Sequence, residues 1–155
     1  MLIDAHLDLA MNALYLDRDI TGSALETRAR EGENPRCGNS TVGLADLRAG
    51  DIDICFATVS VLACRAWMPP GDLNFRSLAE AHQQGRDQIE FYRSIESAGK
   101  IRVITDRSSL EAHLADRPSE NQTAETNSDR PIGVVFLMEG AYPIREPAEV
   151  RDWFD

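Results

Sequence analysis

Lysine is almost absent from this sequence. Lys100 is the only lysine, and 26 acidic residues against 16 basic ones leave a formal net charge of −10 at pH 7. Nucleic acids and anionic membrane surfaces attract clusters of basic side chains, so the acidic excess argues against both as partners. The sequence also lacks the run of about 20 apolar residues that a membrane-spanning helix needs. Residues Met1–Asp4 show no basic region followed by an apolar run, so we expect no signal peptide and a cytoplasmic location.

Cysteine is scarce, and the short motifs of several enzyme classes are missing. Cys37, Cys55 and Cys64 make an odd number, and none belongs to a Cys-x-x-Cys pair, which argues against a zinc knuckle and a dithiol redox site. We expect free thiols in a reducing compartment.

The sequence has no phosphate-binding P-loop, no Gly-x-Gly-x-x-Gly, no Gly-x-Ser-x-Gly and no His-Glu-x-x-His. The sequence therefore gives no support for the enzyme classes that these motifs indicate, namely nucleotide-binding proteins, serine hydrolases and helical zinc proteases.

What is present is the composition of a globular α/β protein. The 155 residues are 43% hydrophobic and 27% charged, which suits one domain or part of a larger one. Runs of β-branched residues alternate with stretches in which apolar residues recur at helical spacing, and this alternation favours a parallel sheet with connecting helices. We expect strands at Leu2–Leu9, Ile52–Ala63, Ile101–Thr105 and Ile132–Met138, and helices at Thr41–Ala49, Phe75–Ala98, Ser108–Leu114 and Pro147–Phe154.

Local signals describe several of these segments further. Ile52–Ala63 is apolar almost throughout, which is typical of a strand buried on both faces. Ser108-Ser109-Leu110-Glu111 predicts a capping box at the start of a helix. Residues 10–40 are charged and interrupted by glycine and proline, which predicts a loop with room for one short helix. Residues 117–130 are almost entirely polar, so we expect a surface loop there.

Three polar side chains are expected on one face of the first strand. Asp4, His6 and Asp8 alternate with apolar residues, which is the two-residue period of a strand. At the C-terminal end of a parallel strand, the His6-x-Asp8 pair would point toward the site formed by the strand–helix loops. An imidazole and a carboxylate together suit Zn²⁺. A hydrogen-bonded structural pair is the simpler alternative, and the pair by itself leaves both open.

Glu139 is the third candidate ligand. It follows a run of apolar residues and precedes Gly140, which lets the backbone turn sharply. A carboxylate at the end of a buried strand costs free energy unless it is paired or bound to a cation. A helix N-cap or an ion pair with Arg145 would also account for it. Together with His6 and Asp8, Glu139 would complete a three-ligand site whose fourth position is open to water, as in catalytic zinc sites.

The other candidate residues give weaker signals. His82 and His113 lie in predicted helices with polar neighbours, so we expect both to face solvent. Trp67 and the Met-Pro-Pro sequence at 68–70 follow the second predicted strand. They could line the rim of a pocket or cover the end of the sheet.

Several segments taken together resemble the membrane (renal) dipeptidase family. Asp4-Ala5-His6-Leu7-Asp8 is similar to the family's Asp-Gly-His-x-Asp opening strand, with Ala5 in place of the glycine. Asp46-Leu47-Arg48-Ala49-Gly50 resembles the step into its second strand. Ile89–Tyr92 resembles its next helix, and Ile132–Gly140 resembles its strand that ends in Glu-Gly. The segments follow the family's order across essentially the whole chain.

The resemblance implies a (β/α)8 TIM barrel with parallel strands and two zinc ions, of which residues 1–155 would form the N-terminal portion of a single metallo-hydrolase domain. His6 and Asp8 would bind the first ion, and Glu139 would bridge both. The family's other zinc histidines and its acid/base aspartate come from later strands, so ligands for at most one ion and no complete catalytic set are expected in this chain.

The implied function is zinc-dependent hydrolysis of dipeptides, with full activity absent from this chain alone. A different amidohydrolase-type enzyme acting on amides or esters, and a non-catalytic truncated homologue, are the alternatives. The natural dipeptide, its stereochemistry and homo-oligomer formation are left open.

Overall fold

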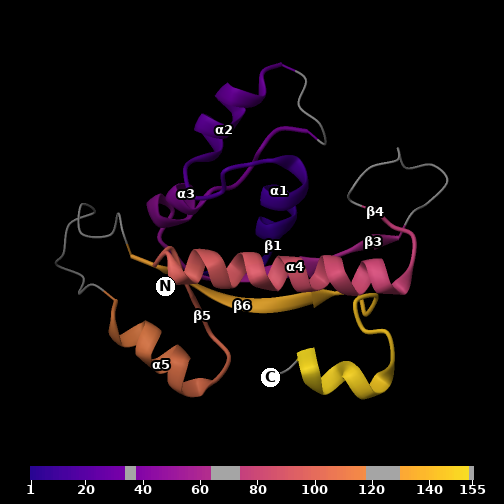
Figure 1. Ribbon diagram of the computed structural model, residues 1–155. Helices are drawn as coiled ribbons and strands as arrows, with labels where there is room; N and C mark the ends of the chain where they lie inside the picture. The colour runs from indigo at the N-terminus through magenta and orange to yellow at the C-terminus, as the bar shows by residue number, and fades with distance from the viewer. Residues whose placement is uncertain (34–37, 64–73, 118–129, 154–155) are drawn as a thin grey trace.

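The structure is a computed structural model, and it describes residues 1–33, 38–63, 74–117 and 130–153 (Figure 1). Four parallel strands form the central sheet in the spatial order β1-β2-β6-β5, and β3 and β4 form a separate parallel pair. The predicted α/β class with a parallel sheet is confirmed. The strands are β1 Leu2–Leu7, β2 Ile52–Ser60, β3 Leu62–Ala63, β4 Asn74–Phe75, β5 Ile101–Val103 and β6 Ile132–Glu139.

The spatial order of the strands departs from their order along the chain. β6 rather than β5 lies beside β2. β5 lies at the edge of the sheet and pairs only with the first part of β6, from Ile132 to Val134. The strand predicted at Ile101–Thr105 is therefore shorter than expected, because the chain turns at Asp106 into the next helix. β1 forms the opposite edge.

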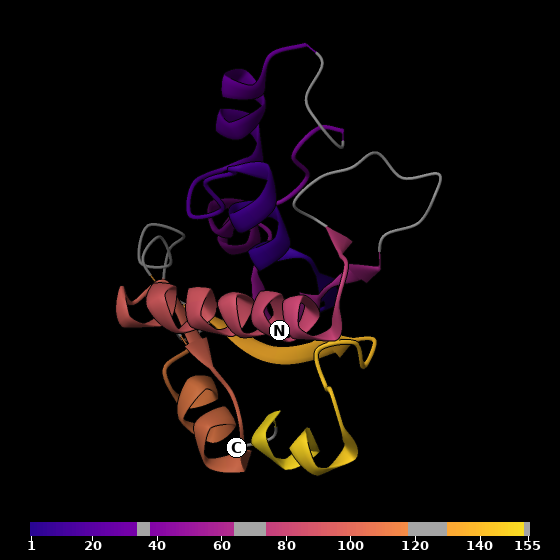
Figure 2. The same cartoon turned by 45° about the vertical axis from the view of Figure 1, so that its right-hand side comes forward.

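The helices lie on two sides of the strands. In both views α1, α2 and α3 lie on one side of α4 and the sheet, whereas α5 and the C-terminal 3-10 helix η2 lie on the other (Figure 1, Figure 2). Within the described ranges, no helix combines the length and apolarity that crossing a membrane requires. The helices are α1 Leu9–Leu16, α2 Ala24–Glu31, α3 Leu44–Ala49, α4 Leu78–Ser97, α5 Arg107–Ala115 and η2 Pro147–Trp153.

The prediction of a loop with one short helix at residues 10–40 was wrong, since two helices form there. α1 begins at Leu9, directly after the first strand. α2 begins after Ser23, whose hydroxyl accepts from the Glu26 N–H while the Glu26 carboxylate accepts from the Ser23 N–H. This reciprocal capping box satisfies two backbone donors at the start of the helix. Its Ser-x-x-Glu signal is present in the sequence, in a stretch whose charge and glycines suggested a loop.

Helix α5 is capped two residues earlier than the sequence suggested. The Asp106 carboxylate accepts from the Ser109 N–H at 2.7 Å, and the Ser109 hydroxyl accepts from the Asp106 N–H at 3.1 Å. Asp106 is therefore the N-cap in place of Ser108. Aspartate is as good an N-cap residue as serine. The sequence is therefore compatible with a helix capped by Asp106 or by Ser108, and the structure has Asp106.

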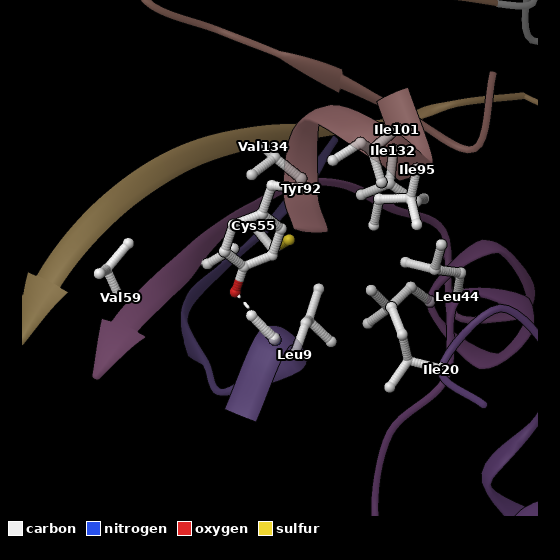
Figure 3. Packing of buried hydrophobic residues seen from close by; sticks show 13 residues of the cluster. Leu9, Ile20, Leu44, Cys55, Val59, Tyr92, Ile95, Ile101, Ile132 and Val134 are labelled. Carbon is white, nitrogen blue, oxygen red and sulfur yellow. Dashed lines mark hydrogen bonds between the residues drawn. The ribbon is translucent and has the colours of Figure 1, made fainter. Parts of the chain in front are cut away.

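The apolar core lies between the sheet and helices α1, α3 and α4. Almost every residue of β2 is buried, as predicted for a strand with both faces covered. Leu44 and Leu47 of α3 are buried as their spacing predicted, and Tyr92 and Ile95 of α4 pack into the same cluster. Figure 3 shows the Tyr92 ring beside Cys55, with its hydroxyl directed toward the start of α1. This packing fixes α1, which directly follows the first strand, against the sheet.

A buried ionic cluster lies at the N-terminal end of β2. The side chain of Asp53 is 1% exposed, and its Oδ1 lies 2.6 Å from Nη1 of Arg130 and 3.0 Å from Nε of Arg117. Both ends of segment 118–129 are thus fixed to one carboxylate, while the interior of the predicted surface loop lies outside the described residues. His113 is buried, with Nε2 3.1 Å from the Asp53 carbonyl oxygen. Its predicted solvent-facing position was wrong.

The C-terminal segment packs against α4. His82 is half-buried, with Nδ1 2.9 Å from the Pro143 carbonyl oxygen and its ring edge-on to Trp153. The solvent-facing position predicted for this histidine was also wrong. A Cβ at Gly85 would meet Pro143 at 2.9 Å and Trp153 at 3.0 Å, so the glycine makes this close approach possible. The helix predicted to begin at Pro147 is the 3-10 helix η2.

Candidate metal centre

Three neighbouring strands end at the same edge of the sheet. In the parallel register, Leu7 of β1 lies beside Ala57 of β2, and Ser60 of β2 lies beside Glu139, the last residue of β6. Asp8 follows β1 directly and is the N-cap residue of α1. The residues that end β1 and β6 therefore meet at the carboxyl ends of the strands, which is the edge where open α/β sheets bind ligands.

His6, Asp8 and Glu139 come together at this edge. Each offers one potential ligand atom, and these three atoms lie within 4.8 Å of one another. His6 Nε2 lies 3.7 Å from Asp8 Oδ1 and 3.9 Å from Glu139 Oε2. The prediction that Glu139 lies close to both residues of the first strand is confirmed. That the three residues bind a metal ion stays a prediction.

The two distances from His6 are close to those within a zinc ligand set. Ligand atoms around a tetrahedral zinc ion, with bonds of about 2.0–2.2 Å, lie about 3.3–3.6 Å apart. The two distances from His6 Nε2 exceed this spacing by about 0.1–0.6 Å. The side chains of His6 and Glu139 are 49% and 51% exposed, so small rotations can close the gap. The His6–Asp8 distance of 3.7 Å is beyond hydrogen-bonding range, but the same rotations would bring the two groups within it, so the hydrogen-bonded structural pair stays an alternative.

Glu139 neither pairs with Arg145 nor caps a helix. Arg145 binds Glu149, with its Nε 2.8 Å from Glu149 Oε1 and its N–H 2.9 Å from Glu149 Oε2. Glu139 is not a helix N-cap, because it ends β6 and Gly140 turns the chain with φ +80°. Over the described ranges, no lysine or arginine forms a salt bridge with Asp8 or Glu139. Both structural alternatives to a ligand role for Glu139 therefore fail.

Glu139 is nevertheless more exposed than the sequence suggested. A carboxylate buried at the end of an apolar strand was expected, whereas the second half of β6 is only half-buried and Glu139 is exposed. Water can therefore solvate the Glu139 carboxylate, and burial does not require it to have an ion-pair partner. The case for a cation rests instead on two carboxylates and an imidazole that converge, and among the described residues no lysine or arginine forms a salt bridge with either carboxylate.

Asp8 is held at both its backbone and its side chain. Its carbonyl oxygen accepts from the Asn12 N–H at 3.0 Å and from Asn12 Nδ2 at 2.7 Å. Its carboxylate Oδ1 accepts from the Thr58 hydroxyl at 2.5 Å. Asp4 has a different partner, since its carboxylate accepts from the His6 N–H at 3.0 Å. Asp8 lies just beyond the strand on which it was predicted. It is a ligand candidate together with His6, whereas Asp4 stabilises the local backbone.

Cys55 does not extend the ligand set. It is fully buried in the core, and burial raises the pKa of its thiol to about 12. The thiol therefore stays protonated near neutral pH, and a protonated thiol is a poor metal ligand. Cys37, Cys64, Trp67 and the Met-Pro-Pro sequence at 68–70 lie outside the described residues, so the predictions about them stay open.

The sequence analysis did not predict the residues that support this edge of the sheet. Besides Thr58, the backbone of Ser60 is fixed by Gln88: the Ser60 N–H donates to Gln88 Oε1 at 2.9 Å, and Gln88 Nε2 donates to the Ser60 carbonyl at 2.7 Å. A signal was available, because Thr58 and Ser60 interrupt an apolar strand two residues apart and so share one face.

Comparisons of the chain with models of known protein families, with curated protein sequences and with solved structures found no match. The functional inference therefore rests on the residues themselves and on how the fold arranges them.

Proposed function

We propose that this chain carries the zinc-binding part of a dipeptide-hydrolysing active site of the membrane dipeptidase type. His6, Asp8 and Glu139 would bind the ion at the C-terminal edge of strands that belong to a (β/α)8 barrel. The observation that carries the proposal is the convergence of these three side chains. His6 lies in β1, Asp8 follows that strand directly, and Glu139 ends β6 far along the chain. Their ligand atoms lie within 4.8 Å of one another.

The donor set fits zinc better than the hard divalent cations. Mg²⁺ and Ca²⁺ prefer oxygen ligands alone, whereas zinc binds both imidazole nitrogen and carboxylate oxygen. Three protein ligands leave a position for water, which is the pattern of catalytic sites rather than structural ones. A zinc ion bound there supplies a Lewis acid and lowers the pKa of its bound water. The second carboxylate oxygen of Glu139 remains free to bridge to another ion.

Dipeptides as the substrate are proposed from the resemblance to the dipeptidase family. Two of the segments that carry this resemblance, the Asp4–Asp8 strand and the Glu139-Gly140 strand end, meet in space as a shared site requires. The neighbouring order β1-β2-β6 is compatible with three successive barrel strands, whereas β5 pairs with the start of β6 at the edge where a further barrel strand would pair.

A zinc titration tests the proposal. Residues 1–155 would be purified, stripped of metal and titrated with zinc against a chromophoric chelator, alongside the variants His6→Ala, Asp8→Asn and Glu139→Gln. Glu111→Gln is the matched control, because Glu111 is an exposed carboxylate on α5. We expect one equivalent of zinc to bind to the wild type and to the control, and each of the three site variants to bind it at least about tenfold more weakly.

The outcomes separate the proposal from its alternatives. Absence of zinc binding, or binding that none of the three substitutions weakens, would overturn the metal centre. If zinc binds as expected and a longer form of the protein exists, that form would be assayed on dipeptides, other amides and esters. Hydrolysis restricted to amides or esters other than dipeptides would contradict the dipeptidase assignment and leave the metal centre in place.

A further inference from the structure

Asp8 occupies a position where two roles compete for its carboxylate. It is the N-cap residue of α1, where an aspartate side chain usually accepts a hydrogen bond from a backbone N–H of the first helical turn. In this protein the Asp8 side chain makes no such bond. It turns toward His6 and Glu139 instead, and its Oδ1 accepts from the Thr58 hydroxyl.

We propose that Thr58 is a positioning residue of the metal centre: its hydroxyl directs the Asp8 carboxylate away from the helix terminus and toward the ion. The inference rests on the proposed metal binding by His6, Asp8 and Glu139. It adds a residue from β2 that touches neither the ion nor the substrate and acts through Asp8. It also accounts for a polar side chain in the middle of a buried strand.

The hydroxyl of Thr58 is suited to this role by its burial and its geometry. Thr58 is completely buried, so water does not compete for its proton. Its Oγ1 lies 2.5 Å from Asp8 Oδ1 and 3.4 Å from the Leu7 carbonyl oxygen, which makes the carboxylate the main acceptor. The hydrogen bond occupies one lone pair of Oδ1. The other carboxylate oxygen and the second lone pair of Oδ1 remain for a cation.

The backbone of Thr58 is itself fixed by α4. The Tyr92 hydroxyl donates to the Thr58 carbonyl oxygen at 2.8 Å and accepts from the Ala10 N–H at 3.1 Å. Tyr92 is fully buried, and burial holds the pKa of its hydroxyl above the usual range, so the group stays protonated and able to donate. One side chain therefore joins β2 to the start of α1, the two elements whose separation sets the distance from Thr58 to Asp8.

The chain offers both a clean substitution and a matched control. Thr58→Val keeps the shape of the side chain and replaces the hydroxyl by a methyl group, whereas Thr58→Ser keeps the hydroxyl. Thr21→Val is the control, because the Thr21 hydroxyl also donates to an aspartate, Asp19 Oδ1 at 2.6 Å, in the loop between α1 and α2. Zinc affinity would be measured by chelator competition, and the urea unfolding midpoint would be measured for each metal-free protein.

We expect Thr58→Val to weaken zinc binding about 10–100-fold, which is the usual effect of removing a group that orients a metal ligand. Thr58→Ser should bind zinc nearly as the wild type does, and Thr21→Val should be unchanged. The metal-free Thr58→Val protein should unfold at a urea concentration close to that of the wild type, since its Asp8 is free to cap α1. The visible spectrum of bound Co²⁺ should also change in Thr58→Val and not in Thr21→Val, because it reports the coordination geometry.

Each result decides a different claim. Wild-type affinity in Thr58→Val would overturn the role of Thr58 while the metal centre stands. Equal losses of affinity in Thr58→Ser and Thr58→Val, together with a lowered unfolding midpoint in both, would show a packing role only and also overturn it. A wild-type protein that binds no zinc would overturn the metal centre, and the positioning role with it.

Discussion

Loss of the Asp53 charge should cost stability, because its carboxylate is buried among positive charges. Its side chain is 1% exposed and lies 2.6 Å from Arg130 Nη1 and 3.0 Å from Arg117 Nε. Asp53→Asn would remove the negative charge and leave the guanidinium of Arg130, which is only 13% exposed, without its counter-ion. Both ends of segment 118–129 would lose their shared anchor.

The magnitude follows from the burial of the two arginines. Breaking a buried ion pair by removing one partner costs about 3–5 kcal/mol. The Arg117 side chain is one-third exposed, so the part of it beyond the buried Nε can be solvated. Asp53 Oδ2 already lacks a hydrogen-bond partner in the native state. We therefore expect the lower end, about 3 kcal/mol. For a chain of this size that corresponds to a fall in Tm of about 6–12 °C.

Urea and thermal unfolding of Asp53→Asn measure this loss, and Asp51→Asn is the control. Asp51 is exposed two residues away and adopts a positive φ of 56°, which asparagine tolerates well. The control should change the free energy of unfolding by less than about 0.5 kcal/mol. If Asp53→Asn is as stable as Asp51→Asn, the buried cluster does not hold the loop ends in solution, and the reasoning is refuted.

Three further predictions concern the core, pH and activity. Tyr92→Phe should lower the free energy of unfolding by about 1–3 kcal/mol, because the buried Thr58 carbonyl and Ala10 N–H each lose a partner; an unchanged urea midpoint would contradict this. Burial lowers the pKa of His113 from 6.5, so the unfolded state takes up the proton first and stability should fall as pH drops below that value. The urea unfolding midpoint should therefore fall as the pH is lowered below 6.5, and this dependence on pH should be weaker in His113→Gln. Residues 1–155 with excess zinc should not hydrolyse dipeptides, since Glu139 alone among the described ligands is left for a second ion; turnover abolished by His6→Ala would contradict it.

The sequence was sufficient for features that depend on local pattern. The α/β class, the parallel sheet and the buried second strand followed from the alternation of segments and the apolar run at Ile52–Ala63. The convergence of His6, Asp8 and Glu139 could also be predicted. Both strand ends had to lie at the carboxyl edge of one parallel sheet, where their side chains meet.

The features that could not be predicted depend on partners distant in sequence. His113 looked exposed because its own helix is polar, yet Gly133 in β6 leaves the space that its ring fills: a Cβ there would meet His113 Nε2 at 2.8 Å. The edge position of β5 depends on its pairing with the start of β6. The hydrogen bond from Thr58 to Asp8 likewise depends on the register that pairs β1 with β2.

Zinc K-edge X-ray absorption on the zinc-loaded protein tests the metal centre most directly, because it reports which atoms surround the ion. Binding by His6, Asp8 and Glu139 predicts nitrogen and oxygen ligands at about 2.0–2.2 Å. It also predicts a single imidazole signal that disappears in His6→Ala and persists in His82→Ala. Sulfur ligands at about 2.3 Å, or an imidazole signal that survives the loss of His6, would show that zinc binds elsewhere and would contradict the metal centre.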